Sequence, residues 1–317
     1  MAYWLARNTR SGSRRNIVAH YDLSNEFFST FLDRGMVYSS AFYRSGAESL
    51  EAAQVEKMDR ACRKLRLCAD DHLLEIGTGW GSLAVHAASR YGCRVTTTTI
   101  SDKQYEAATR RVEAAGLSER VRVVRQDYRD LGGTYDKLVS IEMIEAVGRE
   151  YLGTFVGKCS SLLSPRGLAL IQGITIRDRL YASASRRVDF LKKYIFPGSC
   201  LVGSEALTRA VARHGDLEIV HAEHFGEHYA RTLSDWRGAF LANLGVVRRL
   251  GYDDRFIRMW DYYLAYCEGA MRARRTGVAQ WLLAKPHGRG GSALTWGPDW
   301  GDATRQGIVS PAGVDRA

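Results

Sequence analysis

The spacing of apolar positions changes repeatedly along this chain, and the changes predict strands that alternate with helices. Short apolar or β-branched runs predict strands at residues 73–76, 94–100, 121–124, 137–141 and 168–176. Helical spacing predicts helices at residues 48–67, 82–89, 103–115 and 151–163. Alternation of this kind is typical of a parallel sheet with helices on both faces, so the pattern predicts an α/β fold.

After the fifth strand the pattern changes. Residues 177–218 are predicted to be mostly helical, and a second helical region at 233–274 is rich in aromatic side chains. A short run at 280–285 predicts a closing edge strand, and the Gly- and Pro-rich composition after it predicts a disordered tail. The predicted divisions are a helical cap segment at 1–60, an α/β domain at 61–286 with a helical insertion at about 177–274, and a tail at 287–317.

A glycine-rich turn indicates the chemistry. The strand at residues 73–76 leads into Gly77, Gly79 and Gly81, and a helix follows. Strand, glycine turn and helix together form a nucleotide-cofactor site, because glycine lets the backbone lie against a ligand. The spacing is E-x-G-x-G-x-G, with Glu75 before the first glycine, and not the G-x-G-x-x-G that seats a pyrophosphate. This form suits S-adenosylmethionine, which has no phosphate and a cationic amino-acid end; an ordinary strand–loop–helix is the alternative.

Composition excludes several classes of protein. The chain has 317 residues, of which 45% are hydrophobic and 25% charged, as in soluble globular proteins. No apolar run approaches the ~20 residues that span a bilayer, and the first residues lack the apolar core of a signal peptide, so we expect a cytoplasmic protein. The six cysteines are scattered, which indicates reduced thiols. His221, His224 and His228 have spacings that would cluster on a helix, but no acid or cysteine pairing completes a metal site, so no metal is expected.

The net charge of +10 suits an anionic partner. No nucleic-acid-binding signature is present, so no nucleic-acid partner is expected. Basic side chains lie close to aromatic ones near the start of the chain, which predicts transient contact with an anionic membrane surface; a solvated helix end is the alternative. The residues concerned are Tyr3, Trp4, Leu5, Arg7, Arg10, Arg14 and Arg15.

Several widely spaced motifs, taken together, resemble the cyclopropane fatty-acid synthase family of methyltransferases, which includes the mycolic acid cyclopropane synthases. The resemblance covers roughly residues 5–286, and its specificity comes from the joint order of the motifs. The matching stretches are HYDLSNEFFSTFLD at residues 20–33, MVYSSAFY at 36–43, LLEIGTGWGSLA at 73–84, TTISDKQ at 98–104, VSIEMIEAVG at 139–148, YIFPGSCL at 194–201, HYARTLSDW at 228–236 and YYLAYCEGAM at 262–271.

This resemblance implies a fold, a reaction and partners. The fold would be the Rossmann-like, seven-stranded sheet of class I S-adenosylmethionine-dependent methyltransferases, with a helical cap over an acyl site. The reaction would transfer a methyl group to the cis double bond of an unsaturated fatty acyl chain, most naturally in a phospholipid, and close a cyclopropane. A methylene-branched acyl product, a small-metabolite C-methyltransferase and a lipid-binding protein without catalysis are the alternatives. A peripheral membrane association and a homodimer would fit this family.

The resemblance also implies the cofactor residues. Tyr38 and Ser39 would lie near the methionine end of the cofactor. The glycine loop, with Glu75 and Trp80, would lie along the centre of the cofactor. The ribose and adenine side would be held by Thr99, Ile100, Gln104, Asp127 and Tyr128. The residue types support part of this, because the Gln104 amide can hydrogen-bond ribose hydroxyls without a charge. An N-cap of a helix is the alternative role for Asp127.

The base in this family is taken to be a bound bicarbonate or carbonate. By resemblance, Glu145 and Tyr229 would hold it, Ile174 would contribute main-chain atoms, and Cys267 would lie near the active site. Glu145 stands in an apolar stretch, where a buried carboxylate is costly unless it has a function.

Two positions depart from the family pattern. Ser40 stands at the usual cysteine, and Gln172 stands at the usual histidine. Both side chains can donate hydrogen bonds to an anion, but glutamine cannot shuttle a proton near neutral pH as histidine can. The departures therefore affect the proton step more than methyl transfer.

Overall fold

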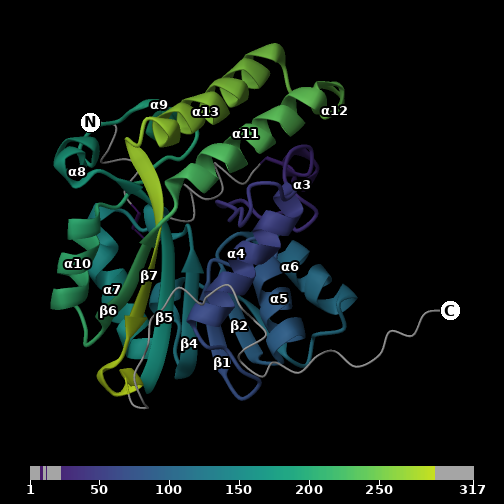
Figure 1. Ribbon diagram of the computed structural model, residues 1–317. Helices are drawn as coiled ribbons and strands as arrows, with labels where there is room; N and C mark the ends of the chain where they lie inside the picture. The colour runs from purple at the N-terminus through teal and green to yellow at the C-terminus, as the bar shows by residue number, and fades with distance from the viewer. Residues whose placement is uncertain (1–7, 10–11, 13–22, 290–317) are drawn as a thin grey trace.

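The computed structural model describes residues 8, 9, 12 and 23–289, and a seven-stranded sheet runs through their centre (Figure 1). The strand order is β3-β2-β1-β4-β5-β7-β6. The first five strands pair in parallel, whereas β7 is antiparallel to both of its neighbours. The strands are β1 (His72–Ile76), β2 (Arg94–Thr99), β3 (Val121–Arg125), β4 (Tyr135–Ile141), β5 (Leu163–Ile176), β6 (Glu218–His224) and β7 (Thr276–Ala284).

The first five predicted strands are confirmed, but the prediction for the other edge of the sheet is wrong. The run at 280–285 belongs to β7, which lies inside the sheet between β5 and β6, and β6 is the edge strand. No strand was predicted at β6, because its sequence EIVHAEH is partly exposed and lacks an apolar run. His221 and His224 therefore lie on a strand and His228 on a helix, so the three do not share a helix face.

Helices cover both faces of the sheet. Side chains alternate along a strand, so Leu73 packs in the apolar cluster that includes α4 and α5, whereas Leu74 packs in the cluster that includes α7 and α10. Figure 1 shows α4, α5 and α6 on one side of the sheet and α7 and α10 on the other. These helices are α4 (Leu50–Lys64), α5 (Ser82–Tyr91), α6 (Asp102–Ala114), α7 (Leu152–Leu162) and α10 (Ser204–Arg213).

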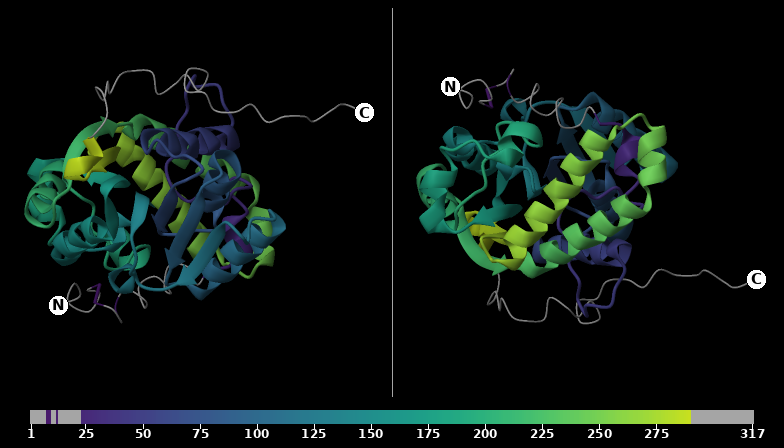
Figure 2. Two further views of the ribbon diagram at one scale, coloured as in Figure 1. Left: turned by 90° about the horizontal axis from the view of Figure 1, so that it is seen from below. Right: turned by 90° about the horizontal axis from the view of Figure 1, so that it is seen from above.

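The remaining helices gather at the end of the sheet where the parallel strands finish. The predicted helical region at 233–274 is made of three helices and begins earlier, at Gly226. Figure 2 shows α11 and α13 side by side across this end. The helices of this layer are α3 (Asn25–Phe28), α8 (Asp178–Ala184), α9 (Phe190–Tyr194), α11 (Gly226–Ala242), α12 (Leu244–Arg249) and α13 (Asp254–Arg272); short 3-10 turns are η1 (Tyr128–Asp130), η2 (Ile144–Ala146), η3 (Arg149–Tyr151) and η4 (Pro286–Arg289).

Aromatic rings join α3 to this helical layer. The buried Phe27 ring lies 4.9 Å from Trp260, 5.2 Å from Phe256 and 4.8 Å from Tyr252, measured between ring centroids. The contacts with Trp260 and Phe256 are edge-to-face, an arrangement that adds to the free energy of simple apolar burial. Most of the predicted aromatic stripe is therefore core, although Tyr262 and Tyr266 are exposed.

Within the described part of the chain, no helix combines the length and the apolar character that crossing a membrane requires. All of the basic and aromatic N-terminal residues of the membrane prediction, and nearly all of the predicted tail, lie outside the described residues, so those two predictions stay predictions.

Candidate active site

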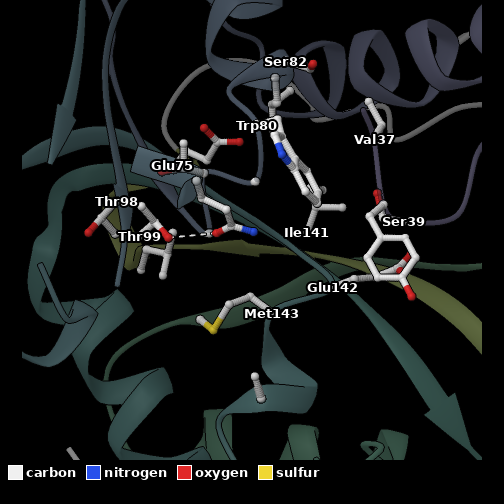
Figure 3. A pocket seen from close by; sticks show the side chains of 18 of the residues that line it. Val37, Ser39, Glu75, Trp80, Ser82, Thr98, Thr99, Ile141, Glu142 and Met143 are labelled. Atoms are coloured by element: carbon white, nitrogen blue, oxygen red, sulfur yellow. Dashed lines mark hydrogen bonds between the residues drawn. The ribbon is translucent and has the colours of Figure 1, made fainter. Parts of the chain in front are cut away.

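A pocket opens where β1, β2 and β4 end, at the edge of the sheet that binds ligands in open α/β folds. Figure 3 shows Glu75, Thr98 and Thr99 on one side of it and Ser39 and Glu142 on the other. All but one of the predicted cofactor residues line this pocket: Tyr38, Ser39, Glu75, Gly77, Gly79, Trp80, Thr99, Ile100, Gln104, Asp127 and Tyr128.

The glycine loop has the backbone conformation that its sequence predicts. Gly77, Gly79 and Gly81 have φ angles of 105°, 54° and 87°, a region that residues with a side chain rarely adopt. A Cβ on Gly79 would meet nothing of the described chain within 4 Å, so the space beside it is open to a ligand. A Cβ on Gly81 would lie 3.1 Å from Ala108 of α6, so Gly81 permits close helix packing and is the predicted residue that does not line the pocket.

Polar side chains follow β2 and β3 at the far side of the pocket. Thr99 Oγ1 donates to Gln104 Oε1 at 2.8 Å, which leaves the Gln104 amide nitrogen as a donor for other groups. Asp127 caps η1 by accepting from the Arg129 backbone N–H at 3.0 Å, and it also pairs with the Arg129 guanidinium at 2.6 Å. The alternative N-cap role of Asp127 is therefore confirmed, although the residue also lines the pocket.

A buried acid lies at the end of β1. Glu75 accepts from Thr97 Oγ1 at 2.6 Å, and burial raises its pKa to about 8. Lys57 on α4 is also buried, and it donates to Ser39 Oγ at 2.5 Å. Its positive charge lowers the pKa of Glu75, while burial lowers the pKa of the Lys57 amine itself to about 8. Sequence reasoning missed Lys57, which faces inward on α4 between Ala53 and Ala61.

A second carboxylate, the half-buried Glu142, follows β4 and was also missed. Its Oε1 accepts from the Ser40 backbone N–H at 2.8 Å and from Gln172 Nε2 at 2.8 Å. Burial raises the pKa of Glu142, whereas Lys57 and hydrogen bonds from Ser40, Gln172 and Tyr229 lower it. Its position directly after a buried strand was a usable signal, since ligands meet that edge of the sheet.

Glu145 lies one turn further on, in η2. Its Oε1 accepts from the Ile174 backbone N–H, while its Oε2 is buried and has no hydrogen-bond partner among the described residues. Burial, together with the nearby charge of Glu142, raises the pKa of Glu145 to about 8. A buried carboxyl oxygen without a partner is costly in a folded protein, so this atom is available to a ligand.

The other predicted catalytic residues lie around these two acids. Ser40 Oγ donates to the Ala41 carbonyl at 3.0 Å, so its backbone, and not its hydroxyl, reaches Glu142. Tyr229 is buried, and its ring packs edge-to-face on Trp236 at 5.9 Å. Cys267 lies close enough to raise the pKa of Tyr229, and burial raises the pKa of the Cys267 thiol to about 12, so it stays neutral.

Gln172 is held by a chain of buried hydrogen bonds. Its Oε1 accepts from Gln280 Nε2 at 2.9 Å, and Gln280 Oε1 accepts from Lys64 Nζ at 2.6 Å. The ammonium of Lys64 also donates to Glu223 at 2.5 Å. An ammonium can only donate, so Gln280 must turn its oxygen toward Lys64 and its nitrogen toward Gln172. Gln172 must then turn its oxygen toward Gln280 and its nitrogen toward Glu142.

Comparison with known proteins agrees with this geometry. Residues 8–281 match the family model described as mycolic acid cyclopropane synthetase. The chain is 39% identical over 285 residues to tuberculostearic acid methyltransferase UfaA1 of Mycobacterium tuberculosis, covering 88% of this chain and 66% of that protein. It is 38% identical over 281 residues to the cyclopropane-fatty-acyl-phospholipid synthase of Escherichia coli K12, covering 88% of this chain and 70% of that protein. The chain thus spans about two thirds of the length of these relatives.

Solved structures show the same fold. The mycolic acid cyclopropane synthase CmaA1 complexed with SAH and CTAB matches with a TM-score of 0.81 and 28% identity, over 86% of this chain and 98% of that one. The cyclopropane synthase MmaA2 from Mycobacterium tuberculosis matches with a TM-score of 0.80 and 28% identity, over the same shares. The sheet and its glycine loop thus define a class I S-adenosylmethionine-dependent methyltransferase fold. Within that class, the chain belongs to the mycolic acid cyclopropane synthetase family of fatty-acid methyltransferases.

Proposed function

We propose that this protein methylates the cis double bond of an unsaturated fatty acyl chain, carried by a phospholipid, with S-adenosylmethionine as donor. The observation that carries the proposal is the open space beside Gly79 in a pocket whose opposite wall holds the half-buried acid Glu142. Family membership and the SAH-bound relative support the donor. A cyclopropane is the first candidate product.

The pocket fits the donor. Gly77 and Gly79 would lie along its centre, Gln104 would hydrogen-bond its ribose, and Glu75 and Ser39 would face its cationic amino-acid end. When bound, S-adenosylmethionine supplies an electrophilic methyl group, whose addition to an alkene carbon leaves a cation on the next carbon.

Residues of the chain itself would then stabilise that cation. Buried rings at the helical layer, among them Trp236 and Tyr263, exclude water and present aromatic faces that suit a positive charge. The hydroxyl groups of Tyr38 and Tyr263 are hydrogen-bonded at 2.8 Å, which holds this wall of the site in place.

Completion of the reaction requires a proton acceptor near the cation. The resemblance implies a bound bicarbonate, but Ser40 N–H and the Gln172 amide already donate to Glu142.

A branched acyl product is the second candidate. It is favoured by Gln172, which replaces the family's usual histidine at the position that would handle the proton, and by the similarity to a tuberculostearic acid methyltransferase. Gln172→His should move the product toward the ring if this position steers proton loss; an unchanged mixture would argue against that role.

Mass spectrometry of lipids from a host that expresses the protein tests the proposed function. We expect unsaturated acyl chains to gain one carbon and two hydrogens, and proton NMR then separates a ring from a branch. Purified protein with S-adenosylmethionine and unsaturated phospholipid vesicles should give the same product. Absence of any methylated lipid in both experiments would overturn the proposal.

Access to a phospholipid requires a peripheral contact with the membrane. Besides the basic N-terminal residues, α9 and α13 carry exposed rings at Tyr194, Tyr262 and Tyr266. Lys193 lies over the Tyr194 ring at 4.9 Å. Aromatic and basic side chains together suit the surface of an anionic bilayer. A homodimer is compatible with this arrangement and is tested by the oligomeric state in solution.

A further inference from the structure

Residues that the resemblance places around bicarbonate already hold a carboxylate of the chain itself. Ser40 stands at the family's cysteine and Gln172 at its histidine. The Ser40 backbone N–H and Gln172 Nε2 each donate to Glu142 Oε1 at 2.8 Å. Tyr229, at the family's tyrosine, also hydrogen-bonds to Glu142. Three elements distant in the sequence thus converge on one side-chain carboxylate.

The hydrogen bonds around Gln172 leave its amide no other orientation. If the amide were turned over, its nitrogen would face Gln280 Nε2 and its oxygen would face the Glu142 carboxylate. Lys64, which is buried, fixes Gln280 by donating to Gln280 Oε1. Gln172 therefore presents its amide nitrogen to Glu142 as a donor.

Charge also disfavours an additional anion. Glu145 is buried and Glu142 half-buried, and they lie close enough for the charge of Glu142 to raise the pKa of Glu145. Lys57 is the cation that acts on Glu142. A free bicarbonate would bring a third negative charge into a site with low dielectric, where like charges repel strongly.

The backbone of Glu142 is itself unusual. Its φ angle is +49°, a conformation that residues with a side chain adopt at a cost. Its N–H donates to the Gln172 carbonyl at 2.8 Å, so the turn is tied to β5. Strain of this kind persists where the surrounding structure holds it, and here it directs a carboxylate into the pocket wall.

We propose that the Glu142 carboxylate replaces bicarbonate as the proton acceptor of the reaction. The inference rests on the proposed function. In the cyclopropane-forming step, a C–H bond of the newly added methyl breaks and its electron pair forms the C–C bond to the cationic carbon. The proton forms an O–H bond with Glu142, which becomes a neutral carboxylic acid and returns the proton to water after the product leaves.

The first test is binding of bicarbonate itself, without turnover. Carbon-13 NMR of labelled bicarbonate should show no binding to the wild-type protein, alone or with S-adenosylhomocysteine. Glu142→Gly removes the carboxylate and suits the positive φ, so the variant should fold and expose the Ser40 and Gln172 donors. We expect Glu142→Gly to bind labelled bicarbonate. Specific binding to the wild-type protein in its pocket would overturn the proposal.

The second test is activity in carbon-dioxide-free buffer. The wild-type rate should not change when bicarbonate is removed. Glu142→Gly should lose about 10²–10⁴-fold in rate, the usual contribution of a general base, and regain part of it with added bicarbonate. Glu142→Gln should lose as much and should not be rescued, because its amide still fills the space.

Controls separate this inference from its premise. Arg66→Gly places glycine at a surface position with a similar φ of 52° and should leave activity unchanged. S-adenosylhomocysteine affinity and melting temperature report whether each variant is folded. The inference alone would be overturned if the wild-type protein methylated lipid only when bicarbonate is present. It would also be overturned if the Glu142→Gly variant kept full activity without bicarbonate. The proposed function would be overturned if the wild-type protein methylated no lipid under any condition.

Discussion

Lys57 Nζ lies 2.5 Å from Ser39 Oγ, inside the same pocket whose wall includes the buried Glu75. Burial shifts the two groups in opposite directions, and each has a pKa of about 8. The amine and the acid therefore titrate in the same range, although their effects on folding fall in different windows of pH.

Glu75→Gln should change the pH dependence of stability. The folded-state pKa of Glu75 is raised above its ordinary 4.5 to about 8, so its contribution to stability is complete below pH 4.5 and is lost as pH rises toward 8. The melting temperature of Glu75→Gln minus that of the wild type should therefore rise between pH 5 and pH 8. Lys57, whose pKa is lowered, changes stability above pH 8 and does not obscure this window. A difference that is flat across the window would show that Glu75 is not held neutral.

Gly79→Val should abolish or strongly weaken cofactor binding. The added side chain would enter the space in which the backbone faces the ligand, and we expect S-adenosylhomocysteine affinity in calorimetry to fall by more than about tenfold. Gly116→Val is a matched control, because Gly116 also has a positive φ, at 66°, and a Cβ there meets nothing of the described chain within 4 Å. Both variants place valine at a similar positive φ, so equal affinities would remove the site assignment.

Glu145→Gln should slow turnover while leaving cofactor affinity nearly unchanged. Glu145 lies beside Glu142 and carries the unpartnered Oε2, but it does not line the cofactor pocket. Loss of an element of general-base catalysis typically costs about 10²–10⁴-fold in rate. Single-turnover kinetics with calorimetry separates the two quantities. Full activity in this variant would exclude Glu145 from the chemistry.

Membrane binding should weaken as salt rises. Exposed charges are screened beyond about 10 Å at 0.1 M salt, so vesicle sedimentation should show less binding to anionic lipid at high ionic strength. Deletion of residues 1–15 and the pair Tyr194→Ser with Tyr262→Ser should each reduce binding further. Equal binding to neutral and anionic vesicles at every salt concentration would argue against an electrostatic contact.

The sequence predicts best those features whose signal is local. The strand before Gly77 and the glycine turn lie within ten consecutive positions, and the turn needs conformations that mainly glycine adopts. The edge strand β6 was missed because half-exposed polar residues give no apolar run, and β7 was misplaced because its pairing partners are set by tertiary structure.

The active site shows the same limit. Glu145 could be recognised as a buried acid in an apolar stretch, but Glu142 stands three residues earlier in equally apolar surroundings. What distinguishes Glu142 is its contact with Ser40 and Gln172, which are far away along the chain. Likewise, nothing local to Gln280 indicates that it orients Gln172. Such networks depend on strand register, which spacing alone does not give.

The ring cluster around Phe27 has a consequence for how the chain folds during synthesis. Its partners Tyr252, Phe256 and Trp260 leave the ribosome long after Phe27 does. Until then, the apolar face of α3 has no α13 to cover it, while the strands from β1 to β5 can already pair. This corner of the molecule can therefore close only after α13 has been synthesised. A nascent chain halted before residue 250 would display those phenyl rings to chaperones, and a late truncation would lead to aggregation in place of a partly active enzyme.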